Sequence, residues 1–167
     1  RPREHDAGTC SSGRAARKRG RACLVSTLDL RYTPDESKFR DEVREFFRTA
    51  QPAHIRRKME LGQRLAKEDI VDWQRILNAK GWAVPSWPVE WGGTGWGPVK
   101  TYIFKEEMQL APAPDPLGFN VSMVGPVLIA FGSDAQKKHF LPKVANCDYW
   151  FCQGFSEPGA GSDLASL

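Results

Sequence analysis

The sequence has little of what marks metal sites, disulfide scaffolds and membrane spans. Its four cysteines include no Cys-x-x-Cys pair, and with the three histidines they form no cluster at zinc-site spacing. The longest apolar stretch, Met123 to Phe131, contains a glycine and a proline and is far shorter than the about 20 residues of a membrane helix. We therefore expect no metal site and no membrane span, and we expect Cys147 and Cys152 to be reduced, as in a cytoplasmic protein.

Neither positive nor negative charge is in excess outside the first residues. Of the 24 basic and 20 acidic side chains, seven basic and two acidic ones lie in residues 1–23, so the remainder, with 17 and 18, is nearly neutral. Nucleic-acid binding needs a basic surface, which the body of the chain lacks. The 41% hydrophobic and 26% charged residues are typical of a globular protein, and 167 residues suffice for one domain with a core.

Residues 1–27 are predicted to form a disordered basic arm. They are rich in Arg, Ser, Gly and Ala and lack apolar periodicity, so they cannot bury enough surface to offset their chain entropy. Three interpretations are open: a basic interaction tail, a mitochondrial transit peptide, or residues upstream of the native start.

Residues 28–147 are predicted to form a helical domain. A capping box at Thr33–Glu36 begins the first helix. The apolar residues of this helix recur at helical spacing, at Phe39, Val43, Phe46 and Phe47. A second helix is expected over Glu68–Lys80, ended by Gly81, and a third begins at Pro98.

The segments between these helices differ in character. The charged run Ala53–Ala66 is predicted to be a solvated connection with His54 on the surface. Residues 82–97 combine Pro and Gly, which prevent regular structure, with four tryptophans, which favour burial. A loop packed against the helices is favoured there over direct ligand contact. Ala111–Pro116 is expected to be a rigid linker.

The apolar run Leu117–Phe131 is predicted to be a buried helix that breaks near Gly125–Pro126. Ser133–Gln136 forms another capping box, and the helix that follows is kinked or ended by Pro142. The chain from residue 28 to residue 147 is thus expected to be almost wholly helical.

A strand-like run of aromatic and apolar residues, Tyr149–Phe155, leads into a glycine-rich turn, Glu157–Asp163. Glycines let backbone N–H groups approach a ligand closely, and such turns can cradle an anion. The hydroxyls of Ser156 and Ser162 add possible donors. From the residues alone, an ordinary polar turn after a strand is equally open.

Three phrases of the sequence resemble the flavin-dependent acyl-CoA dehydrogenases. Residues 155–164, Phe-Ser-Glu-Pro-Gly-Ala-Gly-Ser-Asp-Leu, resemble the family signature. Residues 81–95 resemble its Gly-Trp-x-x-Pro and Pro-x-Glu-aromatic-Gly-Gly-x-Gly phrases, and residues 132–142 resemble its Gly-Ser-x-x-Gln-Lys and Leu-Pro phrases. The resemblance covers residues 28–167. It implies a mainly α fold, in which the N-terminal helical bundle ends at residue 147 and residues 148–167 begin a central β-domain with the first strand of a β-barrel.

The resemblance also implies which residues bind ligands. Phe155 and Ser156 are expected to lie against the flavin ring of FAD, with Gln153 at the start of the contact segment. Ser156 stands where the family most often has Thr. Gly161 and Ser162 are expected to approach the FAD pyrophosphate, and Ser162 also the CoA. Met123, with its neighbour Val124, is expected to line the acyl tunnel, although core packing explains both residues equally well.

The implied reaction is the FAD-dependent oxidation of the Cα–Cβ bond of an acyl-CoA to a trans-2-enoyl-CoA, as in fatty-acid β-oxidation, with an electron-transfer flavoprotein or a similar acceptor. No catalytic residue is expected in this chain, because the family's glutamate base lies in a part beyond it. Glu106 and Glu107 are adjacent on a predicted helix, so their side chains point about 100° apart and cannot face one substrate. Without the remaining domains, we expect these 167 residues neither to hold FAD tightly nor to turn over.

Several alternatives stay open. An acyl-CoA oxidase or another superfamily member would share these phrases, and a non-catalytic helical interaction module with a basic arm is a rival of another class. The sequence also resembles bacterial branches in which two related subunits pair, so a homo- or hetero-oligomer is expected. The phrase at residues 29–34 resembles the opening of bacterial members, which favours a native start near residue 25 or 28. A mitochondrial matrix location follows only if the arm is a transit peptide.

Overall fold

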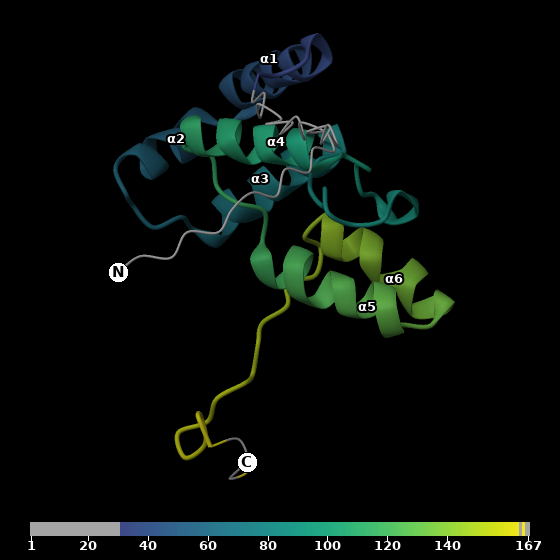
Figure 1. Cartoon of the computed structure of the whole chain (residues 1–167). Helices are drawn as coiled ribbons and strands as arrows, with labels where there is room; N and C mark the ends of the chain where they lie inside the picture. Colours follow the sequence, from purple (N-terminus) through teal and green to yellow (C-terminus); the bar gives the residue numbers. More distant parts are fainter. Residues whose placement is uncertain (1–30, 164, 166–167) are drawn as a thin grey trace, which may run out of the picture. The chain divides into compact units, whose positions relative to one another are not determined.

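The computed structural model describes residues 31–163 and 165. The described residues from Tyr32 onward belong to one unit, in which the helices pack together and the chain after α6 extends away from them (Figure 1). Its helices are α1 (Pro34–Ala50), α2 (Ala53–Glu60), α3 (Lys67–Lys80), α4 (Pro98–Leu110), α5 (Gly125–Phe131) and α6 (Asp134–Ala145), with a 3₁₀ turn η1 (Val89–Trp91) and a π-helical segment η2 (Phe119–Val124). The described residues contain no strand, so the mainly α fold is confirmed. The predicted arm, residues 1–27, and its boundary lie outside the described residues.

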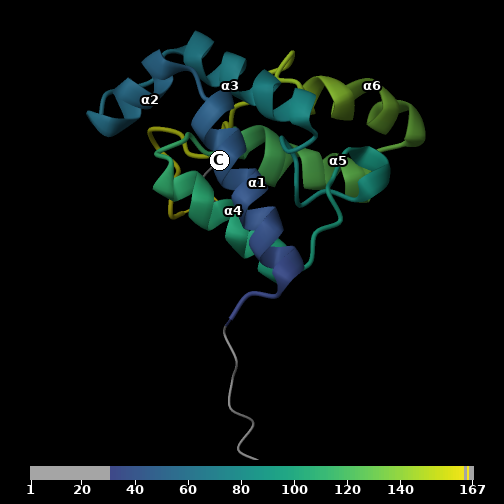
Figure 2. The same cartoon turned by 90° about the horizontal axis from the view of Figure 1, so that it is seen from above.

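Helix α1 packs along α4 (Figure 2). It begins as predicted: the Thr33 N–H donates to Glu36 Oε2 at 2.8 Å, and the Glu36 N–H donates to Thr33 Oγ1 at 3.2 Å. Its buried residues, Phe39, Val43 and Phe47, belong to the main core. Because the predicted stripe faces this core, the apolar periodicity correctly indicated the buried side of the helix.

Helix α2 was not predicted, since Ala53–Ala66 was expected to be a solvated connection. Only Ile55 of this short helix is buried. The Arg56 side chain links α2 to α1, because its Nη2 donates to the carbonyls of Phe47 and Arg48, each at 2.9 Å. These carbonyls lie in the last turn of α1, where a helix leaves acceptors without partners. The helix therefore depends on a tertiary contact that local periodicity does not show.

The tryptophan-rich loop packs against the helices, as predicted. Trp82 and Trp87 are buried, and Trp91 and Trp96 are partly buried against the core. Trp82 lies edge-on to the rings of Phe39, Phe46, Trp96 and Phe104. The Trp87 indole Nε1 donates to the Val121 carbonyl at 2.8 Å, so the loop is also tied to η2. This aromatic cluster supplies burial where the backbone is irregular.

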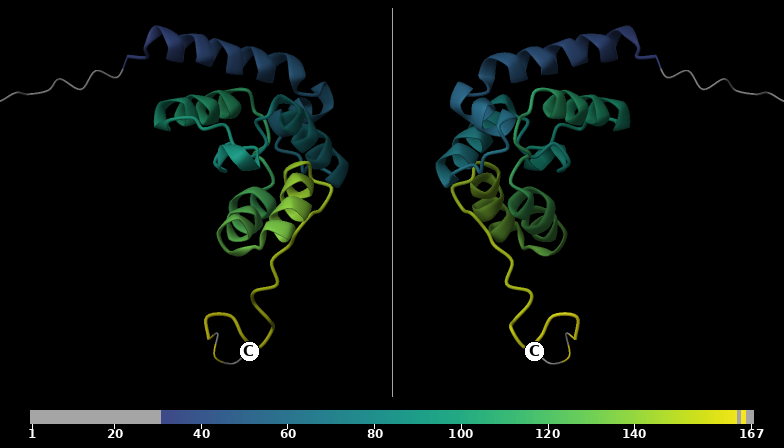
Figure 3. Two further views of the ribbon diagram at one scale, coloured as in Figure 1. Left: turned by 90° about the vertical axis from the view of Figure 1, so that its right-hand side faces the viewer. Right: turned by 90° about the vertical axis from the view of Figure 1, so that its left-hand side faces the viewer.

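The apolar run Leu117–Phe131 is helical but only half buried. The π-helical η2 meets α5 at Gly125, where the predicted break lies. Burial is confined to Asn120, Val121 and Gly125, whereas Phe119, Met123, Val127 and Phe131 are exposed. The expectation of a buried helix was therefore wrong for one face, because α6, which lies beside α5 in Figure 3, covers only the other.

Helix α6 starts at the predicted capping box, with the Ser133 N–H donating to Gln136 Oε1 at 2.8 Å. It continues through Pro142 to Ala145, so this proline does not end the helix. The strand-like run Tyr149–Phe155 forms no strand. A strand needs a neighbour to satisfy its backbone groups, and the described residues hold no other strand.

Candidate functional site

The predicted cofactor residues lie on one exposed segment that follows the helices. Gln153, Phe155, Ser156, Gly161 and Ser162 are all exposed. Within this segment, the backbone groups of Glu157 and Ala160 exchange two hydrogen bonds, of 2.8 and 3.1 Å, which close a tight turn. The hydroxyls and glycines of the turn are therefore accessible from outside the helical domain.

The structure brings Met123 and Gln153 together, although they are far apart in sequence. Both line an apolar hollow of about 640 Å³, which we call the η2–α5 hollow. The other lining residues are Phe119, Ser122, Val124, Pro126, Val127, Leu128 and Cys152. Phe155, Ser156, Gly161 and Ser162 are not part of its lining. The predicted site residues thus fall into two separate parts, a hollow and a glycine-rich turn.

The glycines in and before the turn have open space where a side chain would lie. A Cβ built on Gly154 or Gly159 would meet nothing within 4 Å, and on Gly161 it would meet only Ser156 Oγ at 3.9 Å. None of the three adopts a positive φ, so their backbone angles do not require glycine. The open space beside the backbone fits the close approach of a phosphate group, as the diphosphate of FAD would require.

Asn120 is a polar residue of this region that the sequence analysis missed. Its side chain is fully buried and bonds the backbone of Tyr149 and Phe151, just before the exposed segment. An asparagine inside the otherwise apolar run Leu117–Phe131 was the available signal, because a buried amide requires partners.

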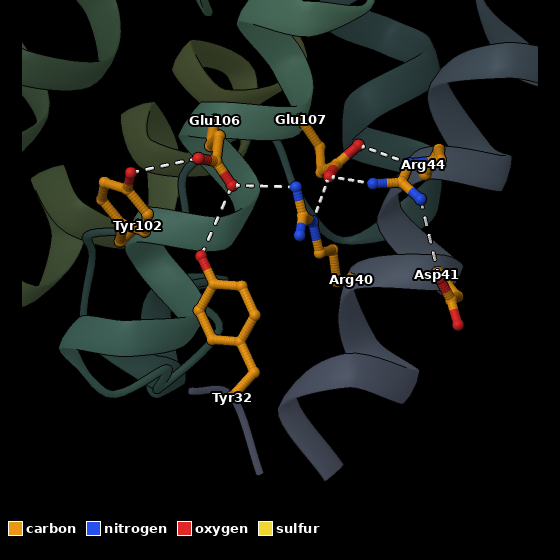
Figure 4. Close-up of polar contacts among 7 residues, drawn as sticks. All are labelled: Tyr32, Arg40, Asp41, Arg44, Tyr102, Glu106 and Glu107. Carbon is orange, nitrogen blue, oxygen red and sulfur yellow. Dashed lines mark hydrogen bonds and ion pairs between the residues drawn. The ribbon is translucent and has the colours of Figure 1, made fainter. Parts of the chain in front are cut away.

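A second polar cluster joins α1 to α4 (Figure 4). Glu107 is buried, with 2% of its side chain exposed. Arg44 donates from Nε and Nη2 to its two carboxylate oxygens at 2.9 and 2.8 Å, and Arg40 Nε donates at 2.6 Å (Figure 4). Glu106 instead accepts from the hydroxyls of Tyr32 and Tyr102, at 3.4 and 3.1 Å (Figure 4). Arg40 Nη2 also pairs with Glu106 at 3.4 Å, so the two neighbouring carboxylates share Arg40 and differ in their other partners.

The electrostatics of this cluster favour a structural role. Burial alone would raise the pKa of Glu107, but the hydrogen bonds from Arg44 and Arg40 outweigh it and hold that pKa below its usual value. Burial and the Glu106 carboxylate raise the pKa of Tyr32. Glu107 is therefore a paired carboxylate at neutral pH, unsuited to accept a proton from a substrate.

Other site classes find little support in the part of the chain that the structure describes. Residues 31–163 and 165 contain no group of three or more His, Cys, Asp or Glu placed to hold a metal ion. Their helices include none long and apolar enough to cross a bilayer. Cys147 is a buried free thiol whose pKa is raised by burial, and Cys152 is an exposed free thiol at the hollow.

The comparison with known families agrees with this geometry. Residues 33–148 match the family model described as acyl-CoA dehydrogenase, N-terminal domain. The chain is also 36% identical over 146 residues to the acyl-CoA dehydrogenase FadE26 of Mycobacterium tuberculosis, which covers 84% of this chain and 35% of FadE26. The chain therefore belongs to the acyl-CoA dehydrogenase family.

One further relative and two solved structures are also similar to the chain. The acyl-CoA dehydrogenase IpdE1 of Mycobacterium tuberculosis is 45% identical over 96 residues, which cover 57% of this chain and 25% of IpdE1. Among solved structures, the ChsE4–ChsE5 complex of the same organism matches with a TM-score of 0.66 at 35% identity, over 84% of this chain and 35% of that chain. The Tcur3481–Tcur3483 steroid ACAD matches with a TM-score of 0.67 at 38% identity, over 84% and 36%. The chain spans about a third of the length of FadE26 and of these solved chains.

Proposed function

We propose that this chain is the N-terminal part of an FAD-dependent acyl-CoA dehydrogenase that converts an acyl-CoA to a trans-2-enoyl-CoA. The observation that carries the proposal is the η2–α5 hollow, because Cys152 and Gln153 complete its lining beside Met123. These two residues begin residues 152–163, which are exposed except for Ala160 and which we call the signature segment. When bound, FAD supplies the hydride acceptor for this oxidation. The chain's own residues bind and orient the reactants, and the glutamate base comes from outside this chain.

The hollow suits an acyl chain. Its lining is dominated by aliphatic, methionine and phenylalanine side chains of η2 and α5, several of them exposed. Burying a methylene group against such a surface contributes roughly 0.8 kcal/mol. Met123 is adaptable in shape, because its side chain is unbranched. The acyl chain would therefore lie along η2 and α5, with its thioester end toward Gln153.

The glycine-rich turn suits the phosphates. Gly159 and Gly161 leave open space beside the backbone, and neither is needed for the turn's own conformation. Phe155, which is 61% exposed, offers a face for the flavin ring, with the Ser156 hydroxyl beside it in sequence. Ser162 follows Gly161 directly and would reach both FAD and the CoA.

The relatives suggest a partner and a substrate class. Two of the similar structures are two-component assemblies, so we infer that this chain also pairs, with a copy of itself or with a related subunit. One of them is a steroid ACAD, which makes bulky polycyclic acyl-CoA substrates a candidate beside straight-chain ones. An electron-transfer flavoprotein is the proposed acceptor, and rapid reoxidation of the reduced enzyme by oxygen would identify an acyl-CoA oxidase instead.

The test is the visible spectrum of the protein expressed from its complete gene. A flavin spectrum that bleaches anaerobically with acyl-CoA is expected, and a colourless protein contradicts the proposal. Gly161→Ala should weaken FAD binding by about tenfold or more, since even small displacements of bound groups are costly. Gly118→Ala is the matched control, because its Cβ meets nothing within 4 Å, the Cβ of Gly161 would meet only Ser156 Oγ at 3.9 Å, and the backbone of Gly118 is helical. Equal FAD affinity of both variants would remove the proposed role of the turn.

A further inference from the structure

We propose that Asn120 is the positioning residue of the signature segment: its buried amide fixes where residues 152–156 leave the helical domain beside Met123. The geometric part stands on this structure alone, and its consequence for FAD rests on the proposed function. A positioning residue acts through others, so Asn120 itself need not touch the cofactor.

The Asn120 side chain joins three parts of the fold. It lies on η2 and is 0% exposed. Its Nδ2 donates to the Val144 carbonyl at 3.1 Å, in the last turn of α6, and to the Tyr149 carbonyl at 2.7 Å. Its Oδ1 accepts from the Phe151 N–H at 3.0 Å. Both N–H donors and an acceptor site of one amide are therefore used, and two of the three bonds hold the segment that leaves α6.

Element η2 is itself held in place. Its π-helical turn is wider than an α-helical one, a distortion that is frequent at functional sites. The Trp87 indole donates to the Val121 carbonyl at 2.8 Å, and Gly125 lies so close to the Trp87 ring that a Cβ would meet Cζ2 at 2.0 Å. The anchor of the Asn120 side chain is thus a backbone that the tryptophan-rich loop restrains.

The same short element carries both the anchor and the hollow. Asn120 and Val121 of η2 are buried, whereas Met123 is 49% exposed and lines the hollow. Cys152 and Gln153, the next residues after Phe151, line the hollow from the other side. Any shift of Phe151 relative to Asn120 therefore changes the distance between the two walls.

The neighbouring hydrogen bonds show where the backbone around Asn120 is held. The Tyr149 N–H donates to the Lys143 carbonyl at 3.3 Å, which holds Tyr149 on α6 but does not reach Phe151. Beyond Phe151, the next hydrogen bonds found along the described chain join Glu157 and Ala160 within the turn itself. The Asn120 amide is thus placed where the chain leaves α6, directly before residues 152–156.

Gln74 provides a matched control. It is also a buried amide, 1% exposed, whose Nε2 donates to the Ala145 carbonyl at 3.1 Å. Its Oε1 accepts from the Leu117 N–H at 3.1 Å. Gln74→Ala and Asn120→Ala each remove a buried amide that bonds the end of α6, but only Asn120 bonds the segment after α6.

The first experiment measures amide hydrogen exchange by NMR in the 167-residue chain. Asn120→Ala should speed exchange of the Phe151 amide by about tenfold or more, while Gln74→Ala leaves it unchanged. Unchanged exchange in Asn120→Ala overturns the proposal. An equal increase in both variants also overturns it, because the effect would then be a general loss of stability.

Asn120→Asp keeps the proposal testable if the alanine variant does not fold. A carboxylate can still accept from the Phe151 N–H, but it cannot donate to the Val144 and Tyr149 carbonyls, and its charge repels their oxygens. This repulsion should displace the segment, and the protonated form, which has one O–H donor, removes it. Protection of the Phe151 amide should therefore be weak at neutral pH and recover as the pH falls. Full protection at neutral pH would show that the donors of Asn120 do not hold the segment.

The second experiment measures FAD affinity and the visible flavin spectrum of the complete gene product. Asn120→Ala should weaken FAD binding by about tenfold or more and shift the flavin absorption, whereas Gln74→Ala should change neither. Equal FAD affinity and spectra in Asn120→Ala and the unmodified protein overturn the link to the cofactor. A colourless unmodified protein instead contradicts the proposed function, and the exchange result still decides whether Asn120 positions the segment.

Discussion

Glu106 and Glu107 show how strongly position decides what a residue does. They are adjacent in sequence, yet Glu107 is buried between two arginines and Glu106 faces two tyrosines (Figure 4). The side chains of Arg40 and Arg44 are 31% and 53% exposed, so each guanidinium keeps contact with water while it pairs with Glu107. The buried carboxylate is therefore neutralised without isolating the cations from solvent.

At this scale, Glu107→Gln should lower the free energy of unfolding by roughly 1–3 kcal/mol, because it weakens hydrogen bonds to a charged and buried group. Glu106→Gln is the matched control and should lower it by less than about 1 kcal/mol, since its ion pair with Arg40 is long, at 3.4 Å, and partly exposed. Urea unfolding followed by circular dichroism measures both. Equal losses would show that the cluster does not distinguish the two carboxylates.

At the scale of elements, the tryptophan-rich loop and η2–α5 form one unit. The Trp87 indole lies against Gly125, the residue where η2 ends and α5 begins. The Trp87 ring therefore holds this junction in two ways, by the hydrogen bond from its indole N–H to the Val121 carbonyl and by its contact with Gly125. An irregular loop can position a helix because its aromatic side chains, rather than its backbone, supply the contacts.

Gly125→Ala should destabilise the chain by about 1–3 kcal/mol, because its Cβ would meet the rigid Trp87 ring at 2.0 Å. Adding Trp87→Leu should recover part of this loss relative to the sum of the single changes, as expected for residues in contact. Thermal unfolding of the two single variants and the double variant measures the coupling. Strict additivity would contradict the contact.

At the scale of the whole molecule, the free energy of unfolding should decrease as the pH becomes acidic. Asp69 accepts hydrogen bonds from Lys58 and from the Ala66 N–H, which lower its pKa from 3.8, and the pKa of Glu107 is lowered from 4.5. A carboxyl with a lowered pKa in the folded state stabilises the fold above its unfolded pKa and loses that contribution as pH falls through its folded value.

The unfolding temperature should therefore be nearly constant from pH 7 to about 5 and fall steadily below the ordinary carboxyl pKa values. A double variant, Asp69→Asn with Glu107→Gln, should start lower at neutral pH and show a flatter decline. Circular dichroism melts across this range test both points. An equally steep decline in the double variant would assign the acid sensitivity to other groups.

Much of the fold could be predicted from interactions between residues close in sequence. The capping boxes at Thr33 and Ser133 and the left-handed Gly81 at the end of α3 were predictable because each depends on residues within one turn. The apolar face of α1 was equally predictable from the sequence, and the phrases that resemble the family indicated the class of protein. The effect of Pro142 on α6 was not fixed by the sequence, because a helix can continue through a proline where packing compensates for the lost hydrogen bond.

The sequence by itself therefore determined where most helices begin and end, the helical class and the family, since these depend on neighbours along the chain. Only the tertiary structure decided that α2 forms against the last turn of α1, that one face of η2–α5 stays exposed, and that Met123 and Gln153 line one hollow. It also decided that Asn120 is buried among backbone groups of α6 and of the residues directly before the signature segment. These features depend on contacts between residues distant in sequence, and no periodicity within one segment encodes which distant surface will cover it.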